Sequence, residues 1–225
     1  MRIHKDMPIN HKGQDFFVGD IHGEYELLLA TLAQCQFNFD CDRLFSVGDI
    51  VDRGADSVAC VELLSKSWFY AVRGNHEEML FADKGSELAR IHQHAGGDWF
   101  YQCSAQEQDR LKALIEEYCP IAFTIESKFG DIGVCHANAP DNWSELQNAN
   151  ADNVELIKDC IWSKNQYQQV KQGEVFPIRD VKFTIHGHVN CARVTTNSNQ
   201  LWIDTLMQTK RLTVLSAQQA FMVIA

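Results

Sequence analysis

The sequence predicts an α/β fold, because strand-like and helix-like patterns alternate over its first third and strand patterns return after residue 120. Short apolar or aromatic runs are separated by stretches with apolar residues three and four positions apart, which is the β-α-β-α-β order of a parallel sheet with right-handed crossovers. The predicted elements are a strand at Asp15–Val18, a helix at Glu24–Gln36, a strand at Leu44–Val47, a helix at Asp56–Lys66 and a strand at Trp68–Val72.

The next segment, Glu77–Tyr118, is predicted to be mostly helical, with a break at the sequence HAGGDWF, His94–Phe100. Ser104 and Glu107 have the spacing of a capping box, which starts a helix by pairing its first N–H groups with side chains. An apolar stripe along that helix is formed by Leu111, Leu114, Ile115 and Tyr118. Pro120 ends the helix, since proline cannot continue one.

The second half of the chain is richer in strands. Ile121–Ile125 and Ile132–Val134 flank a turn that contains Gly130 and predict a hairpin. Residues 138–180 are polar and are expected to be irregular. Four further strands are predicted, at Phe183–Ile185, Leu201–Ile203, Leu212–Leu215 and Phe221–Ile224. Because no linker or low-complexity tract interrupts the pattern, we expect residues 1–225 to form a single domain.

The composition narrows the classes of function. A formal net charge of −10 makes nucleic acid a poor partner, so an anionic substrate would need local positive charge from arginine or metal. No apolar run approaches the roughly 20 residues that span a bilayer, and the polar N-terminus lacks the apolar core of a secretory signal, so no membrane partner is expected. None of the eight cysteines forms a C-x-x-C pair; we expect reduced thiols and a cytoplasmic protein.

Motifs rich in metal-binding or phosphate-binding side chains, four of them with glycine, lie at the ends of five of the predicted strands. They are GDIHG at Gly19–Gly23, GDIVDRG at Gly48–Gly54, RGNHE at Arg73–Glu77, VCHA at Val134–Ala137 and IHGH at Ile185–His188. In an open α/β sheet, ligands bind beyond the carboxyl ends of the strands. These motifs are therefore predicted to converge in space although they are far apart in the sequence.

The motifs contain six side chains that suit a divalent metal: Asp20, His22, Asp49, Asn75, His136 and His188. Carboxylate, imidazole and amide ligands favour Mn²⁺, Fe, Zn²⁺ or Mg²⁺ over metals that prefer thiolates. So many ligands indicate two metals about 3.5–4 Å apart that share a carboxylate, for which Asp49 is the natural bridge. Each motif alone also fits a helix-capping turn, and each late histidine alone fits a buried core residue; their joint occurrence favours the metal site.

Together, GDIHG, GDIVDRG and RGNHE resemble the signature of the metal-dependent phosphoprotein phosphatases. The chain length and the GGDWF element, Gly96–Phe100, are similar to the bacteriophage-lambda-type subgroup and its bacterial relatives. This resemblance, which covers essentially the whole chain, implies a calcineurin-like metallophosphoesterase fold: a central β-sandwich of mixed sheets flanked by helices. It also implies two divalent metal ions, with Mn²⁺ the first choice and Fe, Zn²⁺, Mg²⁺ or Ni²⁺ as alternatives.

By position, the resemblance implies a role for each site residue. Asp49 would bridge two metals whose other ligands are Asp20 and His22 for the first, and Asn75, His136 and His188 for the second. Arg53 and Arg73 would bind phosphate oxygens. His76, held by Asp52, would protonate the leaving group.

The implied reaction is hydrolysis of phosphoserine or phosphothreonine, with phosphotyrosine also admitted, in phosphorylated proteins or peptides. A phosphate monoester repels hydroxide, and two metals relieve this by neutralising the phosphoryl oxygens and by forming the hydroxide that attacks phosphorus directly. Two alternatives remain open. A symmetrical diadenosine tetraphosphate hydrolase would share the first three motifs, and a non-catalytic phosphopeptide-binding module would share the scaffold.

Three departures from the family pattern bear on these expectations. Lys164 stands where relatives carry a second phosphate-binding arginine, and lysine keeps the charge but loses the bidentate fork. Leu206 follows the IDT element where glycine is usual. His186 gives HGHV in place of FGHT, and we expect it beside the ligands or facing solvent rather than as an extra ligand.

Overall fold

The computed structural model describes residues 1–224 and contains two β-sheets. The first has four strands in the order β10 (Val214–Ser216), β2 (Asp15–Val18), β3 (Arg43–Ser46) and β4 (Phe69–Ala71). The second has six, in the order β1 (His4–Met7), β5 (Ala122–Ile125), β6 (Ile132–Cys135), β7 (Phe183–His186), β9 (Gln200–Trp202) and β8 (Thr195–Asn197). Strands β2, β3 and β4 are parallel and β10 is antiparallel, so the predicted parallel unit and the mixed character of the sheets are confirmed.

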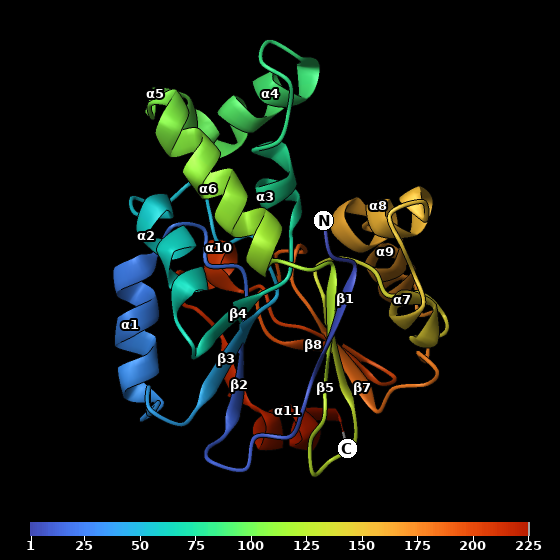
Figure 1. Ribbon diagram of the computed structural model, residues 1–225. Coiled ribbons are helices and arrows are strands. Elements are labelled where there is room, and N and C mark those ends of the chain that lie inside the picture. The colour runs from blue at the N-terminus through green and yellow to red at the C-terminus, as the bar shows by residue number, and fades with distance from the viewer. Residues whose placement is uncertain (225) are drawn as a thin grey trace.

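The two sheets pack face to face and both are covered by helices on their outer sides (Figure 1). Phe17 and Phe45 of the four-stranded sheet pack against Phe123 of the other sheet, and the rings of Phe45 and Phe123 lie 5.7 Å apart. Phe16, the neighbour of Phe17, packs into the core beneath the helices instead. Because both faces of this sheet are buried, its strands are continuous apolar runs without a polar alternation.

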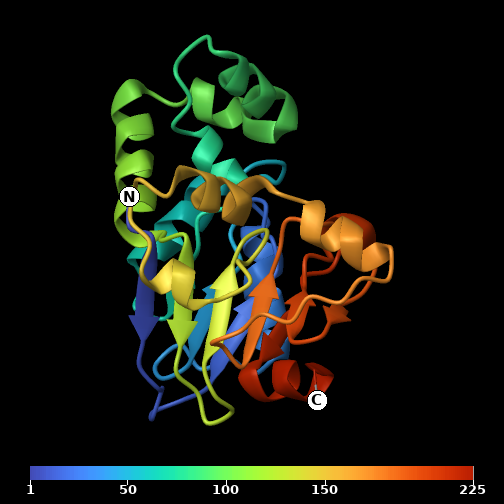
Figure 2. The same ribbon diagram turned by 90° about the vertical axis from the view of Figure 1, so that its right-hand side faces the viewer.

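Helices flank the sandwich on each side (Figures 1 and 2). On the four-stranded side lie α1 (Tyr25–Gln34), α2 (Ser57–Glu62) and a 3₁₀ turn at Leu63–Ser65. On the six-stranded side lie α7 (Ser144–Gln147), α8 (Val154–Trp162) and α9 (Asn165–Lys171). The sequence prediction that residues 138–180 are irregular is therefore wrong. These helices are short and, apart from α8, offer too few turns for a clear apolar stripe.

A group of helices rises beyond the carboxyl ends of β2, β3 and β4, at the top of Figure 1. It comprises α3 (Asn75–Met79), α4 (Glu87–His92), a π turn at Gln93–Gly97, α5 (Asp98–Gln102) and α6 (Ala105–Tyr118). The predicted break falls at the π turn, where Gly96 has a φ of 106°. The Oγ of Ser104 accepts a hydrogen bond from the N–H of Glu107 at 3.2 Å, so the serine half of the predicted capping box is confirmed. The glutamate half is not formed, because the Glu107 carboxylate pairs with Arg110.

The predicted strand at Phe221–Ile224 is wrong, because these residues belong to helix α11 (Ala217–Ile224). A capping box starts this helix: the Oγ of Ser216 accepts the N–H of Gln219 at 3.2 Å, and Gln219 Oε1 accepts the N–H of Ser216 at 2.8 Å. This S-x-x-Q signature stands in the sequence and outweighs the short apolar run that follows it. Strands β1 and β8 and the short helix α10 (Leu206–Thr209) were also not predicted.

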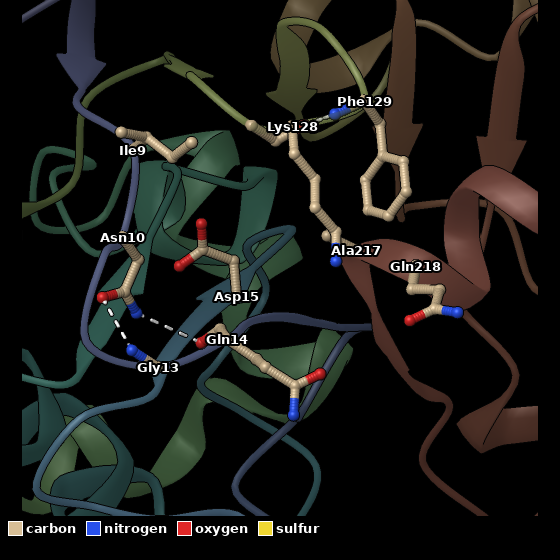
Figure 3. Close-up of a pocket in the computed structure, with 10 residues that line it drawn as sticks. Ile9, Asn10, Gly13, Gln14, Asp15, Lys128, Phe129, Ala217 and Gln218 are labelled. Atoms are coloured by element: carbon tan, nitrogen blue, oxygen red, sulfur yellow. Dashed lines mark hydrogen bonds between the residues drawn. The ribbon is translucent and has the colours of Figure 1, made fainter.

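A small pocket of about 190 Å³ lies at the end of the sheets where β2 and β6 begin (Figure 3). Its lining includes Asn10, Asp15, Lys128, Phe129 and Gln218. The two carboxylate oxygens of Asp15 accept hydrogen bonds from Nε and Nη2 of Arg43, at 2.7 and 2.8 Å. The predicted site residues follow the opposite ends of the strands, so this pocket is separate from them. Among residues 1–224, no helix has the length and apolar character needed to cross a membrane.

Candidate metal centre and active site

The loops that follow β2 and β3 are joined to each other by backbone hydrogen bonds. The carbonyl of Asp49 accepts the N–H groups of Ile21 and His22 at 3.0 and 2.8 Å. Five residues of the site have left-handed backbone, with φ between 47° and 71°: His22, Asp49, Asp52, Arg53 and His188. Such a conformation costs a non-glycine residue about 1–3 kcal/mol and persists only where the surroundings hold it.

Glu77 holds the loop after β3 in this conformation. Its buried carboxylate accepts the N–H groups of Asp49, Ile50 and Gly74 at 2.8 Å and that of Val51 at 3.3 Å. Burial and then the charge of Asp49 raise the pKa of Glu77 to about 7. Glu77 stands in the RGNHE motif, but the sequence pattern indicates no role for it, since its partners lie 26 to 28 residues away, apart from Gly74.

Replacing Glu77 with alanine is expected to lower the free energy of unfolding by about 3–5 kcal/mol, because buried N–H groups left without an acceptor cost about 1–3 kcal/mol each. Urea unfolding of the metal-free protein measures this. The matched control is Glu87→Ala, an exposed glutamate on α4, which should change stability by less than about 0.5 kcal/mol. Equal effects of the two substitutions would refute the clamping role.

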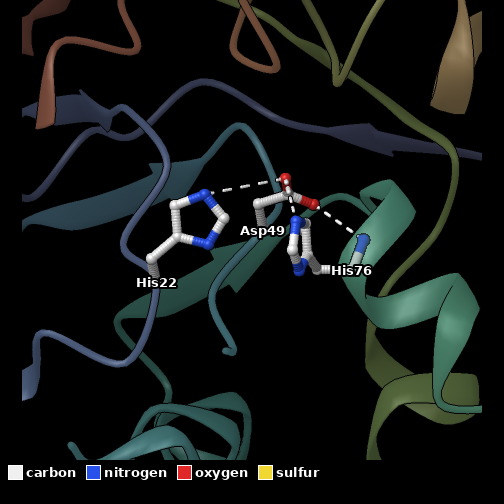
Figure 4. A group of neighbouring side chains, drawn as sticks. All are labelled: His22, Asp49 and His76. Atoms are coloured by element: carbon white, nitrogen blue, oxygen red, sulfur yellow. Dashed lines mark hydrogen bonds and ion pairs between the residues drawn. The ribbon is translucent and has the colours of Figure 1, made fainter. Parts of the chain in front are cut away.

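The first group of candidate ligands is His22, Asp49 and His76, which are drawn in Figure 4. The Nδ1–H of His22 donates to the carbonyl of Val51 at 3.0 Å, which leaves Nε2 as a lone-pair donor. This Nε2 lies 3.9 Å from an oxygen of Asp49 and 3.9 Å from an oxygen of Asp20. Burial lowers the pKa of His22 to about 4, which keeps the ring neutral and suited to a metal.

The second group is Asp49, His136 and His188. His136 donates from Nδ1 to the carbonyl of Val47 at 2.7 Å, and its Nε2 lies 3.3 Å from Asp49 and 3.1 Å from the amide oxygen of Asn75. Three atoms that carry lone pairs therefore meet at one point. Burial would lower the pKa of His136, but the charge of Asp49, the hydrogen bonds to Asp49 and to the carbonyl of Val47, and the charge of Glu77 together outweigh burial and raise that pKa. This point therefore favours a positive charge, whether a proton or a metal.

His188 completes the second group through its other ring nitrogen. The Nε2 of His188 contacts the carbonyl of Trp162 at 3.1 Å, which leaves Nδ1 free to bind a metal. Its ring lies 4.9 Å from that of His136, and its backbone N–H donates to both oxygens of Asp20, at 3.2 and 3.1 Å. Burial lowers the pKa of His188 to about 3. Asp20, Asn75 and His188 are thus brought into one cluster, as the sequence predicted.

Negative charge is crowded in this cluster. Burial, and then the charges of Asp204 and Asp49, raise the pKa of Asp20 well above its ordinary value. Asp204 is itself buried, its pKa is raised to about 6 by burial and by Asp49, and its Oδ1 has no hydrogen-bond partner among the described residues. Three buried carboxylates beside neutral imidazoles fit two divalent cations, which would neutralise them.

Gly74 supports the close approach of these groups. A Cβ on Gly74 would lie 2.2 Å from Oδ1 of Asp49. This agrees with the idea that glycines stand before the ligands because they leave room for them.

His76 and Asp52 form a pair beside the first group. The Nδ1 of His76 donates to Asp52 at 2.6 Å, and its Nε2 lies 3.8 Å from Asp49. Burial would lower the pKa of His76, but the charge of Asp49 and the hydrogen bond to Asp52 together outweigh burial and raise that pKa. Two partners of Asp52, His92 and Trp99, were given no role by the sequence.

The three predicted phosphate-binding side chains differ in their surroundings. Arg53 is exposed and donates from Nη1 to His22 Nε2 at 2.6 Å and from Nη2 to His76 Nε2 at 3.0 Å. Arg73 is buried, pairs with Glu78 at 3.1 Å, and its Nε and Nη2 have no hydrogen-bond partner among the described residues. Lys164 is exposed and precedes α9; its charge is one of the smaller contributions that lower the pKa of His188.

His186 lies in the core and not in the metal cluster. Its ring is buried, stacks on Trp202, and contacts the hydroxyl of Thr184 at 2.8 Å and the thiol of Cys135 at 3.4 Å. His186 ends strand β7, which pairs with β6, the strand that precedes the ligand His136, but its ring does not face the site. Solvent exposure, one of the two expected placements, is excluded. Leu206 is likewise buried, at the start of α10.

A two-sheet sandwich with carboxylates and imidazoles gathered beyond its strand ends is the architecture of a metallophosphoesterase. The chain belongs to the calcineurin-like phosphoesterase family, whose model matches residues 16–192. It is therefore a phosphoester hydrolase, and the predicted fold is confirmed.

Several curated relatives match most of the chain. A serine/threonine-protein phosphatase 2 of Escherichia coli is 32% identical over 87% of this chain and 88% of the relative. The protein of the same description from Salmonella typhimurium is 35% identical over 84% of this chain and 85% of the relative. A symmetrical bis(5'-nucleosyl)-tetraphosphatase of Shewanella frigidimarina is 33% identical, but over 57% of this chain and 46% of the relative.

Solved structures agree on the fold. A crystal structure provisionally described as a diadenosine tetraphosphatase superposes with a TM-score of 0.63 at 21% identity, covering 96% of this chain and 94% of the other. A serine/threonine phosphatase from Saccharomyces cerevisiae superposes with a TM-score of 0.60 at 14% identity, covering 96% and 82%. At these identities the likeness concerns the fold alone.

Proposed function

We propose that the chain is a metal-dependent protein phosphatase that hydrolyses phosphoserine and phosphothreonine in phosphorylated proteins or peptides. The observation that supports this most directly is the pair of ligand groups that share Asp49, with Arg53 and His76 beside them. The curated relatives that span most of the chain are protein phosphatases, whereas the tetraphosphatase match is partial.

In this proposal Asp20, His22 and Asp49 would hold one divalent cation, and Asp49, Asn75, His136 and His188 would hold a second. The ligand set accepts several hard and borderline divalent metals, and Mn²⁺ is the ion that the resemblance to the metal-dependent phosphatases favours. When bound, the cations neutralise phosphoryl oxygens and lower the pKa of a coordinated water.

The remaining residues of the chain bind and protonate the substrate. Arg53 is exposed at the rim of the cluster, so its guanidinium can turn from the two imidazoles to the phosphoryl oxygens and hold them with two parallel hydrogen bonds. Asp52 orients His76 and keeps its Nδ1 protonated, and Nε2 of His76 delivers a proton to the departing serine or threonine oxygen. Arg73 and Lys164 provide further contacts to the phosphate in this proposal.

The proposal extends to the setting of the enzyme. All eight cysteines are free thiols and five of them are buried, which suits the reducing cytoplasm. In this proposal residues 1–225 form one catalytic domain, because the residues of the site come from loops spread between Asp20 and His188.

The expected result is hydrolysis of p-nitrophenyl phosphate that depends on added Mn²⁺ after treatment with a chelator, followed by release of phosphate from phosphoserine and phosphothreonine peptides. A phosphotyrosine peptide in the same panel measures the preference for phosphoserine and phosphothreonine over phosphotyrosine. Production of ADP from diadenosine tetraphosphate without turnover of any phosphopeptide would replace the proposal with the tetraphosphatase activity. Binding of phosphopeptide without any turnover would make the chain a binding module.

A further inference from the structure

Asp52 accepts hydrogen bonds from three side chains, although sequence analysis assigned it only one. His76 donates to Oδ2 at 2.6 Å, and Trp99 donates to Oδ1 at 2.7 Å. His92 Nε2 lies between the two oxygens, at 3.0 Å from Oδ2 and 3.2 Å from Oδ1. The carboxylate has no exposed surface, so these contacts account for its surroundings within the described residues.

We infer that His92 is a positioning residue that fixes the Asp52 carboxylate, and through it the proton-donating ring of His76. The inference rests on the proposed function, since it concerns the step in which His76 protonates the leaving group.

The direction of the bond from His92 follows from simple chemistry. An ionised carboxylate only accepts hydrogen bonds, so Nε2 of His92 must carry the proton and donate it. The carboxylate is shared by two imidazoles, that of His76 on the side of the site and that of His92 on the other side.

His92 is held rigidly enough to act in this way. Its ring is buried, and its Nδ1 lies 3.1 Å from the hydroxyl of Tyr101, which accepts from or donates to Nδ1 according to the ring tautomer. The same hydroxyl lies 3.2 Å from the carbonyl of Ala89, and its single proton serves one of these two neighbours. The ring lies close to Gly97, where a Cβ would collide with it. The π turn after α4 therefore brings the backbone of Gly97 close to His92 and allows Trp99 to donate to the carboxylate of Asp52.

The loss of this contact should act on geometry more than on charge. Without His92, the Asp52 carboxylate would keep its hydrogen bonds from Trp99 and His76. It would lose the donor that contacts both of its oxygens and holds its plane on the side away from the site. His76 would then sample orientations in which Nε2 misses the leaving oxygen. Proton donation by a positioned side chain contributes about 10²–10⁴-fold to rate, and a loosened donor should forfeit about tenfold or more of it.

The test compares His92→Leu with His92→Gln in the full-length, Mn²⁺-loaded protein. The amide nitrogen of glutamine reaches the place of Nε2 and can still donate to Asp52, whereas leucine keeps the bulk without a donor. His92→Leu is expected to lower kcat on a phosphoserine peptide about tenfold or more, with KM unchanged, and to lower kcat on p-nitrophenyl phosphate less than about threefold, because nitrophenolate leaves without a proton. His92→Gln should stay within about threefold of the parent protein on both substrates.

The matched control is His94→Leu. His94 lies on the same segment, is exposed and contacts the carbonyl of Arg90 at 2.7 Å, so all rates should be unchanged. Equal loss on both substrates, loss of bound metal in His92→Leu, or a His92→Gln variant as impaired as His92→Leu would each assign His92 a purely structural part and overturn the inference. The proposed function fails separately, if the parent protein hydrolyses neither substrate.

Discussion

Replacement of Asp49 by asparagine is expected to remove both metal ions and to lower kcat by about 10³-fold or more. The two oxygens of Asp49 face different groups: Oδ1 lies 3.3 Å from His136 Nε2, and Oδ2 lies 3.9 Å from His22 Nε2. An amide can place only one oxygen and must turn its NH₂ group toward the other cation. Several kcal/mol of metal binding and transition-state stabilisation should be lost, and each 1.36 kcal/mol corresponds to a factor of ten.

Unfolding would not account for this loss. Asp49 raises the pKa of Asp20, Glu77 and Asp204, so removing its charge relieves repulsion in the metal-free protein. The measurements are elemental analysis of the purified variant, its turnover of p-nitrophenyl phosphate and its melting temperature without metal. The matched control is Asp6→Asn, which makes the same chemical change at an exposed position on β1 and should keep two metals per chain. Two ions still bound to Asp49→Asn would show that Asp49 is not the bridge.

The sequence predicted the parallel strands and the six clustered ligands because both follow from local signals. A buried strand such as Phe16–Val18 is recognisable by its apolar run, and the ligand follows it within two to four residues, at Asp20 and His22. Once the strands are known to be parallel, their ends must meet at one edge. The convergence of Asp20, His22, Asp49 and Asn75 therefore needed no information about long-range contacts. His136 and His188 follow β6 and β7 of the other sheet, so their place in the cluster depends on how the two sheets pack.

The residues that support the site could not be predicted in this way. Glu77 acts on backbone N–H groups 26 to 28 residues away, and His92 and Trp99 reach Asp52 across 40 and 47 residues. Nothing in a local pattern distinguishes such a side chain from a surface residue of a helix. The π turn at Gln93–Gly97 was visible only as a break, and its role appears when His92 and Gly97 are seen in contact.

Replacement of His76 by asparagine is expected to slow hydrolysis of an alkyl phosphate by about 10²–10⁴-fold and that of p-nitrophenyl phosphate by less than about tenfold. Asparagine was chosen because its amide can keep the bond that Nδ1 of His76 makes to Asp52 at 2.6 Å, while it has nothing in the place of Nε2. The substitution thus removes the proton donor and spares the network behind it. A serine alkoxide leaves poorly without a proton, whereas nitrophenolate does not need one.

The same variant separates the two roles that geometry allows for His76. Its Nε2 lies 3.8 Å from Asp49, near enough for His76 to be a ligand of the first metal together with His22. If His76 is a metal ligand, His76→Asn should lose one metal ion and should slow hydrolysis of both substrates alike. If His76 is the proton donor, elemental analysis should still find two ions, and the loss of rate should grow with the pKa of the leaving group. A series of aryl phosphates of rising leaving-group pKa measures that slope, and a flat series would exclude proton donation by His76.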